Sequence, residues 1–208
     1  MHKFILSVLL AGTIGFANET KPAMHCTLSQ EGPVKISWKA FKTPMKVGVG
    51  GTFATVNFKP VKQKGINFAE ILTGASVTID EASVDSGNQG RDVKLVKFFF
   101  EQMSGKQIVG KIVSVKHDPI VRGKPKTGIL DVELTMNGIT RKVPMRYRFD
   151  QGTLSAEGTI DLFDFNANNA LQALNKACFT KHQGKTWNDV TIAFSTHIKA
   201  VCEPIKQK

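Results

Sequence analysis

Alternation of apolar and polar residues at every second position runs through most of this chain and constrains its fold more than any other feature. The segment 129–136 reads Ile-Leu-Asp-Val-Glu-Leu-Thr-Met, so one face of an extended strand is apolar and the other is mostly polar. Asn137-Gly138, the strongest short hairpin signal, follows it, and the alternation resumes from Lys142 to Phe149. The pattern predicts antiparallel strands with one face in the core and one face in water.

The same period recurs along the chain, which predicts a sheet of many strands. A turn at Asp150-Gln151-Gly152 follows one such segment and precedes the next. The apolar positions are odd-numbered in 47–53 and even-numbered in 54–58. Gly50-Gly51, within this stretch, predicts a β-bulge that would change the inward face of the strand. The further alternating segments are 75–79, 108–117, 154–160 and 190–200.

Two segments depart from the strand period. The pattern over 167–177 predicts a helix, with Asn166 or Asn168 as its N-terminal cap. The segment 91–98 fits either a helical turn or an irregular crossing, because its apolar residues follow neither period cleanly. We therefore expect one or two short helices beside the sheet.

Many antiparallel strands joined by short turns must protect the edges of their sheet. Closing the sheet into a barrel does this, although a two-sheet sandwich fits the same alternation. The chain has 14 Phe but one Tyr and two Trp, which indicates an apolar interior with few polar groups. Such an interior suits either a filled core or a cavity of lipid size. We predict an all-β antiparallel barrel.

The N-terminus predicts export. Met1-His2-Lys3 is a short basic start, Phe4–Phe16 carries no charge, and Gly15-Phe16-Ala17 offers small residues for cleavage. We interpret residues 1–17 as a signal peptide, since the apolar run is shorter than the roughly 20 residues that span a bilayer; an uncleaved anchor is the alternative. Residues 18–208 then form one domain, which we expect in the periplasm.

Export changes the interpretation of the cysteines, because disulfides persist outside the cytoplasm. In a closed antiparallel barrel the first and last strands are neighbours, so Cys26 and Cys202 can meet and form a disulfide. Cys178 would remain free, on a helix face that it shares with Leu171 and Leu174. It is either a buried apolar residue or a reactive thiol.

Charge and motifs exclude several function classes. The net charge is +11, but the basic residues alternate along wet strand faces without interleaved aromatic residues, which argues against nucleic acid. A weak contact with anionic membrane surfaces or mere solubility explains this charge. The sequence has no metal-ligand spacing among its His, no Cys-x-x-Cys, no Gly-x-Ser-x-Gly and no phosphate loop. We expect no cofactor, no metal and no catalysis.

Three ordered blocks resemble a known family. They are Val77–Asn88 followed by Arg91-Asp92, then Leu134–Val143, then Ser155–Phe165. Together they resemble the YceI-like, polyisoprenoid-binding proteins over most of residues 34–200. The resemblance implies an exported, lipocalin-like barrel of eight strands that holds an isoprenoid or another long-chain amphiphile in an apolar tunnel. This chain has Lys94 where the family usually has His.

The predicted tunnel lining consists of apolar residues on the expected inward faces, each of which could equally serve ordinary core packing. Arg91 could hold a head group, or it could form a structural ion pair with Asp92 and cap the turn after Asn88. The candidate ligand-binding residues are Trp38, Phe53, Phe58, Val77, Ile79, Arg91, Phe98, Phe99, Ile112, Leu134, Met136, Met145, Tyr147, Phe163, Phe165 and Phe194.

Three hypotheses for function follow. The first is a lipid-binding protein that carries or sequesters a long-chain isoprenoid or fatty-acid derivative. The second is an exported stress-response module with a filled core and a protein partner. The third, an enzyme that acts on a bound lipid through Cys178, lacks a base and an oxyanion site in the sequence. The oligomeric state, including a homodimer, stays open.

Overall fold

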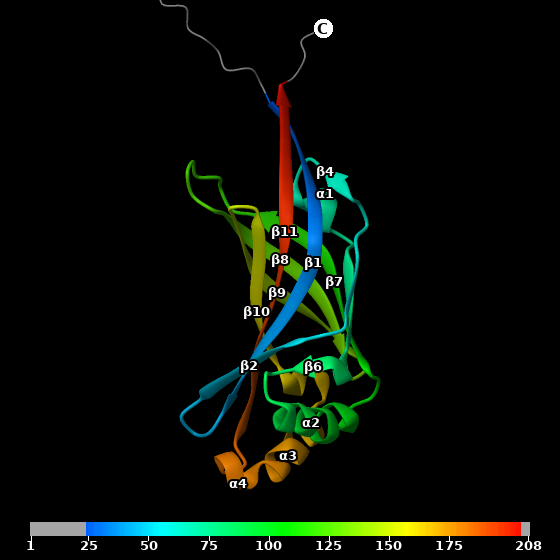
Figure 1. Cartoon of the computed structure of the whole chain (residues 1–208), viewed down its shortest axis with the longest axis vertical. Coiled ribbons are helices and arrows are strands. Elements are labelled where there is room, and N and C mark those ends of the chain that lie inside the picture. The colour runs from blue at the N-terminus through cyan, green and yellow to red at the C-terminus, as the bar shows by residue number, and fades with distance from the viewer. Residues whose placement is uncertain (1–23, 205–208) are drawn as a thin grey trace, which may run out of the picture.

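The computed structural model describes residues 24–204, in which strands dominate (Figure 1). The strands are β1 (Met24–Lys42), β2 (Val47–Phe53), β3 (Val56–Lys59), β4 (Lys64–Gly65), β5 (Ser76–Asp80), β6 (Val84–Asp85), β7 (Gln107–His117), β8 (Lys126–Met136), β9 (Ile139–Asp150), β10 (Thr153–Asp161) and β11 (Thr186–Pro204). The helices are α1 (Phe68–Leu72), α2 (Gln89–Phe98), α3 (Asn168–Ala177) and α4 (Phe179–His182), and the 3₁₀ segments are η1 (Glu81–Ser83), η2 (Phe100–Gln102) and η3 (Leu162–Phe165). The predicted signal peptide, residues 1–17, lies outside the described residues.

All the strands belong to one antiparallel sheet, which confirms the predicted fold class. The strand order is β3-β5-β7-β8-β9-β10-β11-β1-β2-β6, and β4 pairs with β1. Of the 11 described strands, eight (β1, β2, β5 and β7 to β11) have at least five residues, and β3, β4 and β6 are shorter. Among the described residues β3 and β6 end this order, so the hydrogen-bonded sheet curls around the core without closing.

The predicted hairpin turns are confirmed. Asn137 and Gly138 join β8 to β9 with φ angles of 52° and 73°, and Met136 pairs with Ile139 across the turn. Positive φ at both central residues matches the right-handed twist of the flanking strands. Gln151-Gly152 makes the same kind of connection between β9 and β10, with φ angles of 46° and 80°.

The first and last described strands pair with each other, which confirms the predicted disulfide. β1 and β11 each have 19 residues and run antiparallel, so that Cys26 lies opposite Cys202. These two cysteines form a disulfide, and Cys178 is free. Figure 1 shows the two strands projecting together beyond the rest of the sheet.

The bulge predicted at Gly50-Gly51 is wrong. β2 pairs with β1 in unbroken register, with Gly51 opposite Trp38 and Gly50 opposite Lys39. A Cβ atom on Gly51 would lie 2.5 Å from the carbonyl oxygen of Asp85 and 2.7 Å from the Trp38 indole. Close packing therefore requires a glycine at this position. The apolar positions change from odd to even numbers at residues 54–55 instead, where the chain bends between β2 and β3.

Helices α2, α3 and α4 cover one end of the sheet, and α1 lies beside β4 away from that end. The helices are more numerous than expected, although only α2 and α3 reach ten residues. The ambiguous segment 91–98 is helical: it belongs to α2, whose cap Asn88 accepts a hydrogen bond from the Arg91 N–H at 2.9 Å. The cap predicted for α3 is wrong, since Ala167 stands there and offers no side-chain acceptor. Figure 1 shows α2, α3 and α4 together at the end where the β1–β2 hairpin also lies.

Candidate functional site

Three cavities lie in series from this helical end into the interior of the curled sheet. We call them the mouth cavity, of about 520 Å³, the middle cavity, of about 120 Å³, and the inner cavity, of about 80 Å³. Trp38 and Leu174 are among the residues that line both the mouth and the middle cavity, and Ile192 lines both the middle and the inner cavity. The shared residues make the three cavities neighbours in space.

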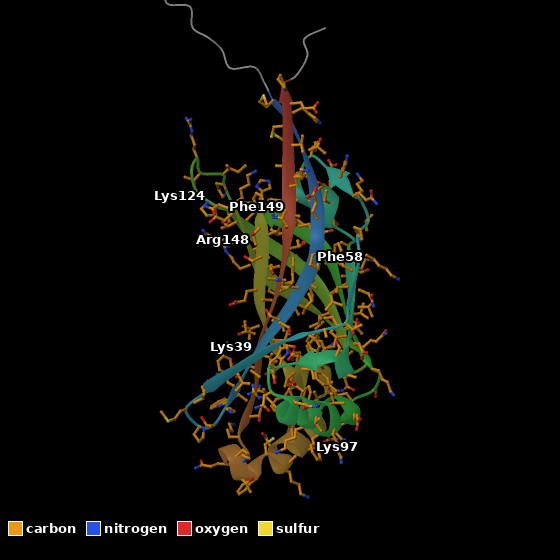
Figure 2. The ribbon with its side chains drawn as sticks, in the orientation of Figure 1. Lys39, Phe58, Lys97, Lys124, Arg148 and Phe149 are labelled. Carbon is orange, nitrogen blue, oxygen red and sulfur yellow. A yellow bond between two sulfur atoms is a disulfide. The ribbon has the colours of Figure 1, made fainter. Side chains whose placement is uncertain are left out.

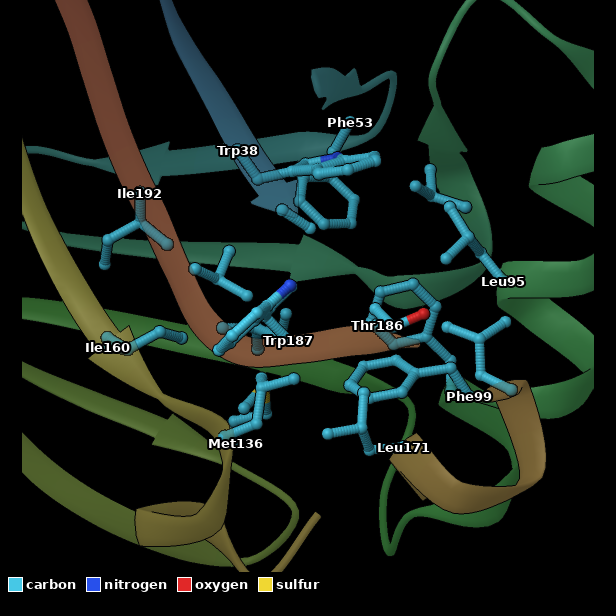
Figure 3. Close-up of a pocket in the computed structure, with 17 residues that line it drawn as sticks. Trp38, Phe53, Leu95, Phe99, Met136, Ile160, Leu171, Thr186, Trp187 and Ile192 are labelled. Carbon is cyan, nitrogen blue, oxygen red and sulfur yellow. The ribbon is translucent and has the colours of Figure 1, made fainter. Parts of the chain in front are cut away.

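The middle cavity is almost wholly apolar (Figure 3). Strands supply one part of its wall, and α2, η2, η3 and α3 supply the rest, so the helical end caps the sheet around it. Thr186 and the two indole rings contribute its only side-chain polar atoms. Its lining is Trp38, Ala40, Phe53, Val84, Leu95, Phe99, Phe100, Ile108, Met136, Ile160, Leu162, Leu171, Leu174, Thr186, Trp187, Val190 and Ile192.

The inner cavity continues between the strands and is also apolar. β1, β3, β5, β7, β8, β9 and β11 all contribute inward-facing side chains to it, because alternate residues of each strand point to the concave face. Its lining is Val34, Ile36, Phe58, Leu72, Ala75, Ser76, Val77, Ile79, Gly110, Ile112, Val132, Leu134, Met145, Ile192, Ala193, Phe194 and Thr196.

The mouth cavity differs from the other two because cations line it. Lys42 comes from the end of β1, Arg91 and Lys94 come from α2, and Lys181 comes from α4. Among its lining residues in the described part of the chain, none is Asp or Glu. The full lining is Trp38, Ala40, Phe41, Lys42, Val49, Asn88, Gly90, Arg91, Lys94, Leu95, Leu174, Cys178, Lys181 and Thr186.

The two tryptophans at this end satisfy their indole N–H groups differently. The Trp187 Nε1–H donates to the carbonyl oxygen of Thr43 at 2.8 Å. The Trp38 Nε1 is buried and has no hydrogen-bond partner among residues 24–204. The Trp38 side chain lines both the mouth and the middle cavity.

Arg91 and Asp92 have separate roles. The Asp92 carboxylate accepts hydrogen bonds from the Ser86 N–H at 3.0 Å and from the Ser86 hydroxyl. The Arg91 guanidinium forms no ion pair within the described residues, while Asn88 caps its helix. The ion pair considered for Arg91 is therefore absent there, and its side chain faces the mouth cavity.

The structure brings most of the predicted lining residues together, in different cavities. Trp38, Phe53, Phe99 and Met136 line the middle cavity. Arg91 lines the mouth cavity. Phe58, which Figure 2 labels beside the strands and above the helical end, lines the inner cavity with Val77, Ile79, Ile112, Leu134, Met145 and Phe194.

Four predicted residues line none of the three cavities. Tyr147 and Phe165 are each 1% exposed and fill the core, where burial raises the pKa of the Tyr147 phenol. Phe98 is partly buried and packs against the core. Phe163 is 46% exposed, because the three-residue turn of η3 directs Leu162 and Phe165 inward together and turns Phe163 outward.

The helices and the last strand supply lining residues that the strand pattern did not reveal. Leu171 and Leu174 lie on the helix face noted in the sequence, and both line the middle cavity. Leu95 and Phe100 come from a region whose apolar residues follow no single period. Trp187 was not among the predicted lining residues, and it lines the middle cavity.

Two further observations concern the described residues alone. Within 24–204, no group of three or more His, Cys, Asp or Glu side chains is placed to hold a metal ion. No helix in that range is long and apolar enough to cross a membrane.

Comparison with known proteins assigns the family. A family model described as the YceI-like domain matches residues 20–198. The chain belongs to this family. No curated protein matches the sequence of this YceI-like protein.

Two solved structures resemble this YceI-like protein in fold. One is a polyisoprenoid binding domain from Saccharophagus degradans, with a TM-score of 0.57 and 14% identity, covering 86% of this chain and 100% of that chain. The other is BcnA from Burkholderia cenocepacia, with a TM-score of 0.52 and 19% identity, covering 80% of this chain and 96% of that chain. Both likenesses support the curled antiparallel fold.

Proposed function

We propose that this YceI-like protein is a periplasmic binding protein that carries or sequesters a long-chain amphiphile, an isoprenoid or a fatty-acid derivative. The observation that carries the proposal is the series of cavities, in which two apolar cavities follow a wider, polar mouth cavity. This order matches a molecule with a polar head and an apolar tail. The mouth cavity alone, of about 520 Å³, falls in the range of roughly 300–1,000 Å³ found for ligand pockets.

Apolar burial supplies the free energy of binding in this proposal. Each buried methylene group contributes about 0.8 kcal/mol before the cost of ordering the chain. The aromatic rings of Trp38, Phe53 and Phe99 give the middle cavity rigid walls, and Met136 can fill irregular gaps. A flexible tail needs dryness more than hydrogen bonds, and these two cavities are almost wholly apolar.

Two further observations support the proposal. The fold neighbour from Saccharophagus degradans is a polyisoprenoid binding domain. The disulfide between Cys26 and Cys202 suits an oxidising compartment such as the periplasm, where the predicted signal peptide would deliver the chain. We propose binding without catalysis. Membrane contact and a homodimer stay predictions.

The first experiment is to identify what the protein carries. The protein is purified from the periplasm without detergent, extracted with organic solvent, and the extract is analysed by mass spectrometry. A stoichiometric long-chain lipid supports the proposal. Protein that is empty and also fails to take up radiolabelled geranylgeraniol, a neutral isoprenoid alcohol, contradicts it and favours an interaction module with a filled core.

A matched pair of variants tests whether the tail occupies the interior. Ile192 stands between the middle and inner cavities, so Ile192→Trp should close the inner one. At roughly 30 Å³ per small group, 80 Å³ holds two or three heavy atoms. Losing about two methylenes costs about 1.6 kcal/mol, or roughly tenfold in the affinity for geranylgeraniol. Thr191→Trp, one residue earlier and on the other strand face, is the control.

Cys178 provides an independent measure of occupancy, because this free thiol lines the mouth cavity. A bound amphiphile should slow its reaction with a thiol reagent, and the slowing should follow the fraction of protein loaded. An unchanged rate in protein saturated with geranylgeraniol would place the ligand elsewhere.

A further inference from the structure

The cations of the mouth cavity lack counter-charges within the described residues, and they gather around one cavity. Lys42, Arg91, Lys94 and Lys181 line it, and none of them has a carboxylate oxygen within 4.0 Å among residues 24–204. The first three are partly buried. Burial removes water from these charges and weakens the screening between them.

Neighbouring cations at the same end are compensated. Lys46 forms an ion pair with Asp189 at 2.9 Å and lies 4.7 Å from the ring centroid of Trp187. Lys185 lies 4.3 Å from the same ring centroid. Lys46 and Lys185 thus each have a partner, whereas the four cations that line the mouth cavity have none among residues 24–204.

This arrangement is unfavourable in the absence of an anion. Like charges around one cavity repel one another, and the repulsion falls with distance and with salt. A single anion inside the cavity would be attracted by all four cations. Phosphate and carboxylate groups match the guanidinium of Arg91 best, since its planar donors can bind two oxygens together.

The unsatisfied Trp38 N–H indicates where such a ligand would pass. Its Nε1 is buried without a partner among the described residues, and the ring borders both the mouth and the middle cavity. A buried donor without an acceptor costs about 1–3 kcal/mol, which an oxygen at the junction of head and tail would recover. The lining of the neighbouring middle cavity is almost wholly apolar.

We propose that the mouth cavity binds an anionic head group, a phosphate or a carboxylate, whose tail enters the middle cavity. Arg91 and Lys94 are the main contacts of the head group, Lys42 and Lys181 add to the attraction, and the Trp38 N–H donates to the oxygen nearest the tail. The inference rests on the proposed function, because it assigns the head of the same amphiphile.

The test compares ligands that share a tail and differ in charge. Dissociation constants are measured for geranylgeraniol and geranylgeranyl phosphate, and for stearyl alcohol and stearate. The full mature protein should bind each anion at least tenfold more tightly than its alcohol. This preference should decrease as salt is added, whereas the affinity for the alcohols should not. Inorganic phosphate alone is included as a competitor.

Variants on α2 connect the preference to the mouth cavity. Arg91→Gln with Lys94→Gln should bring the ratio of the two affinities close to one. Lys97→Gln removes an exposed charge from the same helix, outside the mouth cavity, and should keep the preference (Figure 2). Trp38→Phe should lower the affinity for the anionic ligand by about threefold to tenfold, which is the value of one hydrogen bond.

The outcomes separate this inference from the proposed function. Equal binding of anion and alcohol overturns the head-group site and leaves the binding protein. If none of the four ligands binds, both the head-group site and the proposed function are overturned. Competition by inorganic phosphate at the same concentration as geranylgeranyl phosphate also overturns the inference, since the cavity would then be a site for free anions. Loss of the preference in Lys97→Gln would show that net charge, rather than the mouth cavity, produces it.

Discussion

Glu81 is a buried acid whose ionisation should control the stability of the fold. It lies in η1 between β5 and β6 and is 2% exposed, and its Oε1 has no hydrogen-bond partner among the described residues. Burial, with a smaller contribution from the adjacent Asp80 carboxylate, raises the pKa of Glu81 from 4.5 to about 7. The folded protein therefore holds this proton at pH values where an unfolded chain has released it.

The sign of the effect follows from which state binds the proton more tightly. As the pH rises from 4.5 to about 7, the folded state retains the Glu81 proton and the unfolded state loses it, so the free energy of unfolding falls. At about 1.4 kcal/mol per pKa unit, the loss reaches about 3 kcal/mol above pH 7. Glu81→Gln removes this dependence, because its amide is neutral throughout.

Urea unfolding at pH 5 and pH 8 measures this effect. The loss of stability between the two pH values should be about 2–3 kcal/mol larger for the wild-type protein than for Glu81→Gln. Glu157→Gln, at an exposed position on β10, should behave as the wild type does. Equal losses in the wild-type protein and Glu81→Gln would show that Glu81 ionises normally and would refute the reasoning.

Three other predictions concern stability. Replacing Cys26 and Cys202 by Ser should lower the free energy of unfolding by up to about 5 kcal/mol, since the disulfide closes a loop across 176 positions; urea unfolding of the variant and the unreduced wild type measures this. Gly51→Ala should lower the stability by about 1–3 kcal/mol in thermal unfolding, because its Cβ would meet the Asp85 carbonyl oxygen at 2.5 Å. Asn137→Ala should cost about 2–4 kcal/mol by urea unfolding, since its side chain forms hydrogen bonds with three backbone groups and its φ is positive; Asn137→Gly, which keeps the turn, should cost less.

The strands could be predicted from the sequence because their physical cause is local. The pleat places alternate residues on opposite faces, and a sheet with one wet face requires the period seen in 129–136. The hairpin at Asn137-Gly138 follows from residues that tolerate positive φ. Pairing of Cys26 with Cys202 was expected from a closed barrel, in which the first and last strands are neighbours, and β1 and β11 are neighbours in the open, curled sheet as well.

Helix α2 and the cavities could not be predicted in this way. α2 has no buried residue and leaves Val93 58% exposed, so its sequence carries little of the apolar period that marks a helix. Alternation shows which residues point inward but not whether they fill the interior. Met145 and Tyr147 lie on the same inward face of β9, yet Met145 lines the inner cavity and Tyr147 is packed at 1% exposure.

The sheet and the helical end divide the proposed site between them. The inward faces of the strands form the inner cavity and much of the middle one, where almost any apolar tail gains similar contacts. The charges of the mouth cavity come from α2, α4 and the last residue of β1, at the end of the sheet. A change at Arg91 or Lys94 therefore leaves the strand ladders intact, whereas a change on an inward strand face disturbs the core. Substitutions at these few residues can change the head group that the protein prefers while the tail site stays the same. The residues of the mouth cavity should therefore determine which head group binds, and the curled sheet should determine how much of the tail is held.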